Sequence, residues 1–316
     1  MYIKLSELTA KLHGVARYLL LIDPGDIEYL VGKPGLERSA MLINLNTEEC
    51  YFLQPLENAE TVDCTKIVKY SLRPLEASVT YLAVEDYKSA LLSFVKGFVE
   101  PGSTIALRYD RTPTTIYATL SQLWKVIDVS RELNKFRARK PEHALNSIEK
   151  AALRAFEVVQ RIHLCSDPDC VATAMANVIA RETTLDLPSC YIYSDENRAT
   201  LRIVVAEHQL YRGAASTTVF FKKQHASALR AKIENILVQI VNTVTPGTSC
   251  VSLVERLENT MRTHGFSNPH IEICGLGTSF CEYPTLDDVL SEDCVLDSGT
   301  ALYIAVSYTH LTLPTN

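Results

Sequence analysis

Two short segments place an acid beside a residue that could act in hydrolysis. Glu207 precedes His208, and Cys281 precedes Glu282. A histidine works as a general base when a carboxylate holds its ring, and a cysteine is a nucleophile when a base takes its proton. His208, with Glu207 or Glu282, is therefore one candidate base, whereas Cys281 has no histidine near it in the sequence. The simpler interpretations are a histidine in a solvated turn and a buried thiol.

Two further segments could bind a metal or a nucleic acid. His163, Cys165 and Cys170 are three soft ligands, but a structural zinc site needs four, so a helix end with buried thiols is the simpler interpretation. The run 131–140 is basic, yet its only aromatic residue is Phe136. A nucleic-acid surface combines basic with aromatic residues, so we expect a solvated linker between domains here.

The composition is that of an ordinary globular protein of two domains. The chain has 316 residues, 47% of them apolar and 22% charged, and a net charge of −6 that disfavours a nucleic-acid partner. No apolar run approaches the roughly 20 residues of a membrane span, and residues 1–8 lack a signal-peptide layout. We therefore expect a cytoplasmic protein whose nine cysteines are buried thiols.

The first 130 residues alternate between short apolar runs and helical patterns, which predicts an α/β domain with a mixed sheet. Asp23-Pro24-Gly25-Asp26 predicts a turn, with Asp26 capping a helix from Ile27. Expected strands are 17–22, 39–44, 51–53, 79–84, 104–109 and 125–129, and expected helices are 86–99 and 115–124.

From residue 131 the pattern changes to pairs of helices followed by strands, which predicts an α+β domain. A long helix after Pro141 has apolar residues at three- and four-residue spacing. The other expected helices are 170–184, 225–241 and 252–265, and the expected strands are 189–193, 201–206, 216–222 and 271–274, with a last strand within 289–302.

The C-terminal residues 306–316 are expected to be foreign to the protein. Residues 306–315 resemble one translated frame of a sequencing adaptor, and Ala305 overlaps its first codons. We therefore expect domains at 1–130 and 131–305, the second of them truncated, followed by an adaptor artefact.

Six ordered segments resemble the pita-bread family of creatinase, aminopeptidase P and prolidase (M24). The resemblance covers nearly all of residues 15–304 and implies a creatinase-type, ribonuclease-H-like first domain and a pita-bread second domain. The matching segments are 26–32, 137–142, 211–220, 246–247, the pair 275–277 with 282–284, and 296–299.

The resemblance also implies where two divalent metals would bind, and the visible ligand positions are apolar. Val204 stands for the first aspartate, Ala214 or Ala215 for the second, and Leu276 for the histidine. Ala305 falls at the first glutamate, and the last lies beyond the visible sequence. Either Cys281 or Tyr283 replaces the histidine of the family's His-Glu-x-Pro segment. Arg198, Cys281 and Tyr283 are candidates for lining the cleft.

These replacements predict a non-catalytic member that needs no cofactor and binds a peptide or protein or supports assembly. The family includes such cases, among them the amino-terminal domain of a histone-chaperone subunit, and many members dimerise, so a homodimer fits the resemblance. One alternative is a metal-independent, creatinase-like hydrolase of a C–N bond that uses His208 and Glu282. A second alternative is an X-Pro aminopeptidase or prolidase with non-standard ligands. A membrane partner is not expected.

Overall fold

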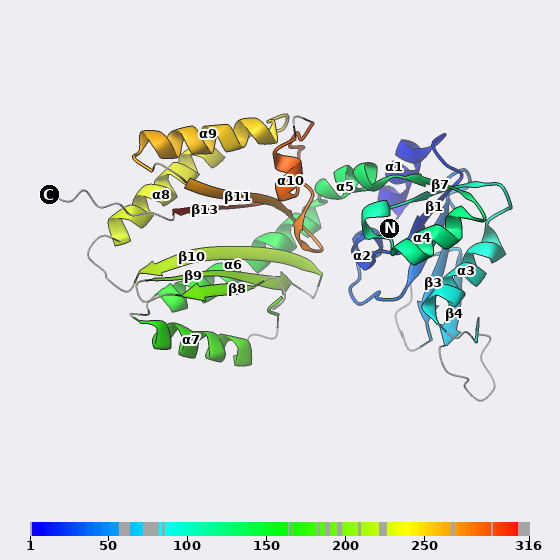
Figure 1. Cartoon of the computed structure of the whole chain (residues 1–316), viewed down its shortest axis with the longest axis horizontal. Helices are drawn as coiled ribbons and strands as arrows, with labels where there is room; N and C mark the ends of the chain where they lie inside the picture. The colour runs from blue at the N-terminus through cyan, green and yellow to red at the C-terminus, as the bar shows by residue number, and fades with distance from the viewer. Residues whose placement is uncertain are drawn as a thin grey trace. The chain divides into compact units, whose positions relative to one another are not determined.

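The chain divides into two compact units, residues 1–136 and 137–316, in the computed structural model of Figure 1. The structure describes residues 2–56, 64–71, 82–83, 86–163, 165, 167–181, 184–186, 190–194, 198–207, 210–220, 226–266, 269–291 and 293–308. The division falls inside helix α5 (Ser130–Ala138), because Leu133 and Phe136 of this helix are buried in the core of the first unit.

Unit 1 is built on a seven-stranded sheet in the order β5-β4-β3-β2-β1-β6-β7. β1, β2 and β3 are antiparallel neighbours, whereas the outer strands on both sides pair in parallel, so the predicted mixed sheet is confirmed. The strands are β1 (Tyr18–Leu21), β2 (Ala40–Asn44), β3 (Cys50–Pro55), β4 (Lys66–Ser71), β5 (Leu82–Ala83), β6 (Thr104–Leu107) and β7 (Lys125–Asp128).

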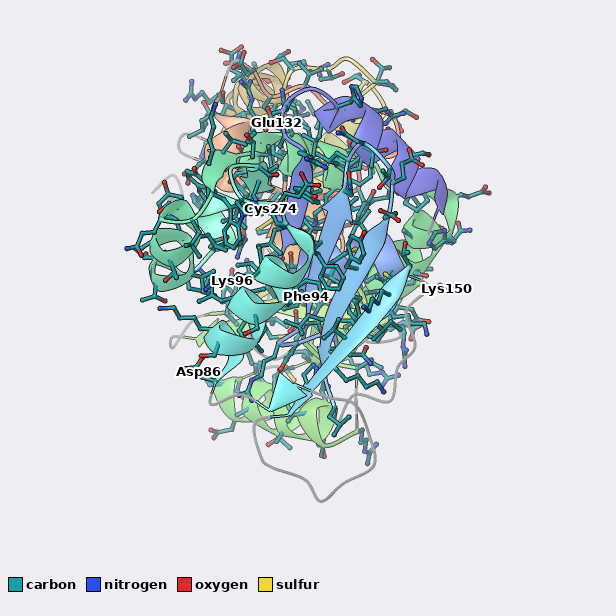
Figure 2. The ribbon with its side chains drawn as sticks, turned by 90° about the vertical axis from the view of Figure 1, so that its right-hand side faces the viewer. Asp86, Phe94, Lys96, Glu132, Lys150 and Cys274 are labelled. Carbon is teal, nitrogen blue, oxygen red and sulfur yellow. A yellow bond between two sulfur atoms is a disulfide. The ribbon has the colours of Figure 1, made fainter. Side chains whose placement is uncertain are left out.

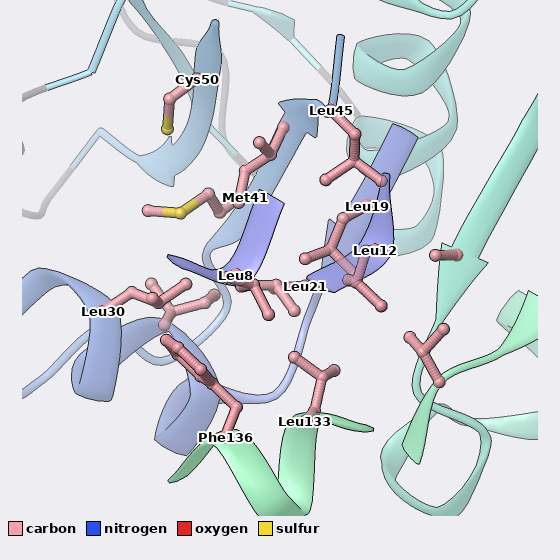
Figure 3. Close-up of a cluster of buried hydrophobic side chains, with 14 of the residues drawn as sticks. Leu8, Leu12, Leu19, Leu21, Leu30, Met41, Leu45, Cys50, Leu133 and Phe136 are labelled. Atoms are coloured by element: carbon pink, nitrogen blue, oxygen red, sulfur yellow. The ribbon is translucent and has the colours of Figure 1, made fainter. Parts of the chain in front are cut away.

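Helices cover both faces of this sheet, which explains why β1 is apolar at every position. Leu19 and Leu21 point to one face, and alternation along the strand sends Tyr18 and Leu20 to the other. Figure 3 shows the first cluster, in which helices α1 (Tyr2–Leu12), α2 (Pro24–Val31) and α5 meet the sheet. Helices α3 (Tyr87–Phe98) and α4 (Thr114–Ser121) cover the other face, and Figure 2 shows α3 beside the strands.

Unit 2 consists of two three-stranded antiparallel sheets, each covered by a pair of helices (Figure 1). One sheet has the order β10-β9-β8, with α6 and α7 packed on it, and the other has the order β12-β11-β13, with α8 and α9. The strands are β8 (Tyr191–Ser194), β9 (Arg198–Glu207), β10 (Tyr211–Phe220), β11 (Pro269–Leu276), β12 (Phe280–Glu282) and β13 (Leu302–Tyr308). The helices are α6 (Glu142–His163), α7 (Pro168–Arg181), α8 (Ala226–Val241), α9 (Cys250–Thr263) and the short α10 (Leu286–Val289).

Several local predictions are wrong. The expected last strand within 289–302 is mostly loop, and β13 begins only at Leu302, because Leu286–Val289 form a capped helical turn instead. The expected solvated linker at 131–140 is mainly the helix α5, which buries one side. Asp23, rather than Asp26, caps α2, since its carboxylate accepts the Asp26 N–H. Helix α1 and strand β4 were not predicted.

In the described part of the chain, every helix is too short or too polar to cross a bilayer.

Candidate functional site

The register of the β9–β10 hairpin decides which residues share the side of the sheet expected to hold metals. Val204 lies directly opposite Ala214, whereas Ala215 pairs with Ile203. Because successive residues of a strand point to opposite faces, Ala214 shares the face of Val204 and Ala215 does not. Ala215 packs instead in the cluster under α6 and α7. Of the two candidates for the second aspartate position, Ala214 is therefore the one that faces the neighbouring sheet.

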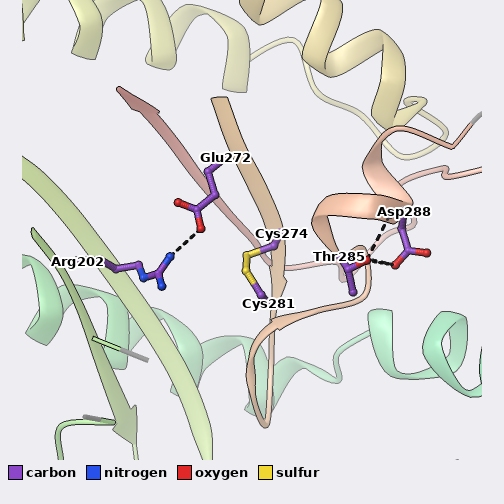
Figure 4. The surroundings of a disulfide bond; sticks show 6 residues. All are labelled: Arg202, Glu272, Cys274, Cys281, Thr285 and Asp288. Atoms are coloured by element: carbon purple, nitrogen blue, oxygen red, sulfur yellow. Dashed lines mark hydrogen bonds and ion pairs between the residues drawn. A yellow bond between two sulfur atoms is a disulfide. The ribbon is translucent and has the colours of Figure 1, made fainter. Parts of the chain in front are cut away.

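The β11–β12 hairpin carries Leu276 and is closed by a disulfide. Cys274 and Cys281 are joined across the hairpin, as Figure 4 shows. A second disulfide joins Cys250 to Cys294. The interpretation of these four cysteines as thiols is therefore wrong. Cys281 has no thiol with which to act as a nucleophile.

An apolar cluster occupies the space between the two sheets of unit 2. Leu276 is 4% exposed and Val204 is fully buried. The cluster is drawn from α6, β10, β11, β12 and β13 and comprises Ala144, Ile148, Leu210, Tyr211, Ala214, Cys274, Leu276, Phe280, Cys281, Ala301, Tyr303 and Ala305. Divalent metals need carboxylate or imidazole ligands, and Val204, Ala214 and Leu276 supply neither, so these positions do not fit a metal pair.

Beside this cluster, Glu282 forms a buried ion triad with two cations of the basic run. Arg137 Nη2 donates to Glu282 Oε2 at 2.5 Å, and Lys140 Nζ lies 2.5 Å from Glu282 Oε1. Arg137 also donates to the Thr278 hydroxyl at 2.7 Å. All three charged side chains are less than 8% exposed. The segments 137–142 and 282–284, which carry part of the family resemblance, thus meet in one contact.

Burial and charge act in opposite directions on the acid–base properties of the triad. Burial lowers the pKa of the Lys140 ammonium, although the Glu282 charge opposes this shift. Burial alone would raise the pKa of Glu282, but the charges of Lys140 and Arg137 outweigh it and hold that pKa below its usual range. Glu282 is therefore an ionised structural group rather than a proton donor at neutral pH.

Two glycines allow the hairpin to approach the triad. A Cβ at Gly277 would lie 1.6 Å from Glu282 Oε1, and one at Gly275 would lie 2.3 Å from the Tyr283 carbonyl oxygen. The Gly-Leu-Gly segment is therefore required by close packing. The nearby Tyr211 hydroxyl is buried and has no hydrogen-bond partner among the described residues, and burial next to Glu282 raises its pKa to about 12.

A small cavity lies between the two sheets, next to the apolar cluster, with which it shares Tyr303 and Ala305. Its volume is about 110 Å³, enough for a few water molecules at about 30 Å³ each. Its lining comprises Tyr191, Thr200, Ser216, Thr217, His270, Glu272, Tyr303, Ala305 and Val306. Val306 belongs to the segment that is expected from its sequence to be foreign to the protein. Arg202 Nη1 donates to Glu272 at 2.7 Å, and its guanidinium lies 4.8 Å from the Tyr191 ring centroid and 4.3 Å from that of Phe280. The cavity therefore offers hydroxyls, an imidazole and a paired carboxylate to a small polar group.

The other predicted residues that the structure describes form no second site. His208 lies outside the described residues, and Arg198 begins β9 but its side chain is not described. Tyr283 packs in the cluster under α8 and α9 instead of lining the cavity. Cys165 is buried beside Cys170, where burial raises the pKa of its thiol to about 11. No group of three His, Cys, Asp or Glu side chains close enough to hold a metal occurs in the described ranges.

Comparison with known proteins gives a clear structural likeness and no sequence match. No family model matches the sequence, and no curated protein matches it. An Xaa-Pro dipeptidase from Bacillus anthracis has a TM-score of 0.73 at 14% identity, over 96% of this chain and 89% of that one. A prolidase from Pyrococcus horikoshii has a TM-score of 0.70 at 13% identity, over 97% and 94%. The N-terminal domain of the FACT complex subunit SPT16 from Cicer arietinum has a TM-score of 0.63 at 12% identity, over 98% and 86%.

These likenesses extend over both units and agree with the resemblance in the sequence. The chain has the fold of the X-Pro aminopeptidases and prolidases.

Proposed function

We propose that this chain is a non-catalytic relative of the X-Pro peptidases that binds a peptide or a protein instead of cleaving one. The observation that carries this proposal is the apolar cluster between the two sheets. Val204, Ala214 and Leu276 stand where the resemblance calls for two aspartates and a histidine. A pair of metal ions that activates water needs such ligands, and aliphatic side chains cannot replace them.

The environment of Glu282 argues against the metal-independent alternative. A histidine base needs an acid that is free to orient its ring. Both carboxylate oxygens of Glu282 are already engaged, one by Arg137 and one by Lys140. Glu282 is therefore not available as a partner for His208. The other alternative, a metallopeptidase with replacement ligands, gains no support from the described acids, histidines and cysteines.

A binding role has two supports. The cavity of unit 2 presents polar groups from both sheets, which suits one small polar side chain of a peptide. One of the fold neighbours is, by its description, a domain of a subunit of the FACT complex, so the fold also occurs in a component of an assembly. We propose that one polar side chain of a partner's peptide enters this cavity, whose volume of about 110 Å³ admits no longer segment.

Metal stoichiometry tests the loss of catalysis. The purified chain is incubated with Mn²⁺, Co²⁺ or Zn²⁺, desalted and analysed for metal by mass spectrometry, with the Bacillus anthracis Xaa-Pro dipeptidase carried through in parallel. We expect almost no metal per chain and no release of proline from X-Pro dipeptides. Tightly bound metal together with cleavage of X-Pro dipeptides would overturn the proposal.

An immobilised peptide array tests the binding role. Ser216→Trp fills the cavity, whereas Thr263→Trp adds the same side chain at the exposed end of α9 and serves as the control. We expect Ser216→Trp to weaken binding of the retained peptides about tenfold or more, equivalent to about 1.4 kcal/mol, while the control binds normally. Equal binding by both variants would place the peptide elsewhere, and a wild-type chain that retains no peptide would contradict the binding role.

A further inference from the structure

Two cysteines of unit 1 lie side by side without a bond between them. Cys50 is the first residue of β3, and Cys64 lies two residues before β4. Their Sγ atoms are 2.7 Å apart. This separation is closer to the 2.05 Å of a disulfide than to the 3.5–4.0 Å of ordinary non-bonded carbon contacts. Both side chains belong to the apolar cluster in Figure 3, in which Cys50 is labelled.

The backbone holds the two residues at a separation that a disulfide can span. The parallel ladder pairs Tyr51 with Lys66, and the Cys50 N–H donates to the Thr65 hydroxyl at 3.0 Å. Thr65 is thus opposite Cys50, and Cys64 lies one residue further along. With strands about 4.8 Å apart and about 3.3 Å per residue, such a position lies roughly 6 Å away, within the 4.4–6.8 Å between the Cα atoms of a disulfide. The bond therefore needs no rearrangement of the sheet.

We propose that Cys50 and Cys64 form a third disulfide, which cross-links the central strand β3 to the start of the outer strand β4. The oxidant is a small-molecule disulfide such as glutathione disulfide. The thiolate of Cys64, the less buried of the two, attacks one sulfur of the oxidant and releases one thiolate. Cys50 then attacks Cys64 in the mixed disulfide and releases a second thiolate. Two cysteine thiols lose two protons and two electrons, and one oxidant disulfide becomes two thiols.

The cross-link would act on the sheet edge formed by the outer strands. In the order β5-β4-β3-β2, β4 and the two-residue β5 lie beyond the antiparallel centre of the sheet. A covalent bond from Cys50 of β3 to Cys64, two residues before β4, fixes the register of β4 against β3. It also gives unit 1 the same kind of cross-link that unit 2 has twice. Disulfides persist in oxidising compartments, so the proposal replaces the expectation of a cytoplasmic protein.

Peptide mapping of the whole chain tests the proposal directly. Trypsin releases one peptide, residues 39–66, that contains both cysteines, because no lysine or arginine lies between Arg38 and Lys66. The protein is equilibrated with glutathione and glutathione disulfide, and its remaining thiols are alkylated without reduction. We expect this peptide to carry no alkyl group and to be lighter than its reduced form by two hydrogen atoms. Cleavage after Glu57 or Glu60 should then leave the two halves joined until a reductant is added.

Variants separate this bond from other sulfur chemistry. In Cys50→Ser the peptide should carry one alkyl group at Cys64, and in Cys64→Ser one at Cys50. Cys190→Ser is the matched control. The Cys190 sulfur accepts a hydrogen bond from the Val204 N–H in unit 2, so this substitution should leave the Cys50–Cys64 cross-link intact. Two alkyl groups on peptide 39–66, while Cys250–Cys294 and Cys274–Cys281 are oxidised, would overturn the proposal. A cross-link from either cysteine to a third one would overturn it as well.

Discussion

The members of the buried ion triad in unit 2 should contribute unequally to the free energy of unfolding. Two cations, Arg137 and Lys140, share one carboxylate, Glu282. Glu282→Gln removes the buried negative charge that both cations share, and breaking a buried ion pair in this way typically costs about 3–5 kcal/mol. Lys140→Met leaves the Arg137–Glu282 pair intact and removes the ammonium that burial disfavours, so we expect a loss of about 1 kcal/mol or less.

Urea unfolding, followed by tryptophan fluorescence and by circular dichroism, measures the difference in stability between these variants in unit 2. The chain has one tryptophan, Trp124, which lies in unit 1, so its fluorescence reports unit 1 alone. Far-ultraviolet circular dichroism reports both units. We expect the unfolding transition of unit 2, which only circular dichroism detects, to shift to a much lower urea concentration in Glu282→Gln and only slightly in Lys140→Met. The fluorescence transition of unit 1 should be unchanged in both variants. Glu272→Gln breaks the partly exposed ion pair with Arg202 and serves as the control, with an expected loss of stability of about 1 kcal/mol.

Glu282 and Lys140 make stability rise with pH in two different ranges, one acidic and one alkaline. Because the folded pKa of Glu282 is lowered, its stabilisation is present above the unfolded carboxyl pKa and is lost as the pH falls through the folded value. The folded pKa of Lys140 is also lowered, so between that value and the ordinary lysine pKa the unfolded chain binds more protons, and stability rises with pH. Lys140→Met should remove this alkaline rise. Equal losses from Lys140→Met and Glu282→Gln at neutral pH would refute the reasoning.

Three further predictions concern other parts of the molecule. Asp26→Asn removes one of the two acidic partners of Arg108, 2.7 Å away, while Asp110 remains, and should destabilise unit 1 by about 1–3 kcal/mol in fluorescence-detected unfolding. Gly277→Ala places a methyl group against the Glu282 carboxylate and should lower the free energy of unfolding of unit 2 by about 1–3 kcal/mol. By contrast, Gly97→Ala places a methyl group of α3 in open space and should raise the free energy of unfolding of unit 1 by about 0.5–1 kcal/mol. Replacing Cys250 and Cys294 together by alanine removes one disulfide, which spans 44 residues, and leaves Cys274–Cys281 in place. This change should lower the melting temperature of unit 2 in calorimetry, since such a loop contributes about 3–4 kcal/mol; an unchanged melting temperature would count against this role.

Sequence patterns predicted the elements whose apolar residues repeat regularly. The long helix α6 and the mixed sheet of unit 1 follow from such periodicity. The basic run 131–140 was misread because the acid that neutralises part of it, Glu282, is 145 residues away from Arg137. Composition cannot reveal such a partner.

The candidate site was predictable in kind but not in detail. The resemblance indicated apolar residues at three ligand positions, but only the strand register distinguishes Ala214 from Ala215. The disulfides were not foreseen, because nine cysteines allow many pairings and spacing alone does not choose among them. The cavity beside Glu272 depends on side chains from both sheets and had no sequence signal.

The closed hairpin has a consequence for evolutionary reversal. Restoring carboxylates at Val204 and Ala214 would place charged groups against an apolar cluster, each at a cost of several kcal/mol until a metal is bound. An imidazole at Leu276 would also have to fit beside the Cys274–Cys281 cross-link, which fixes the hairpin around it. Each single reversion is therefore destabilising before any of them is useful. Under the proposed function, such unstable intermediates would separate this interior from one that binds metal, and loss of the metal ligands would act as a one-way step.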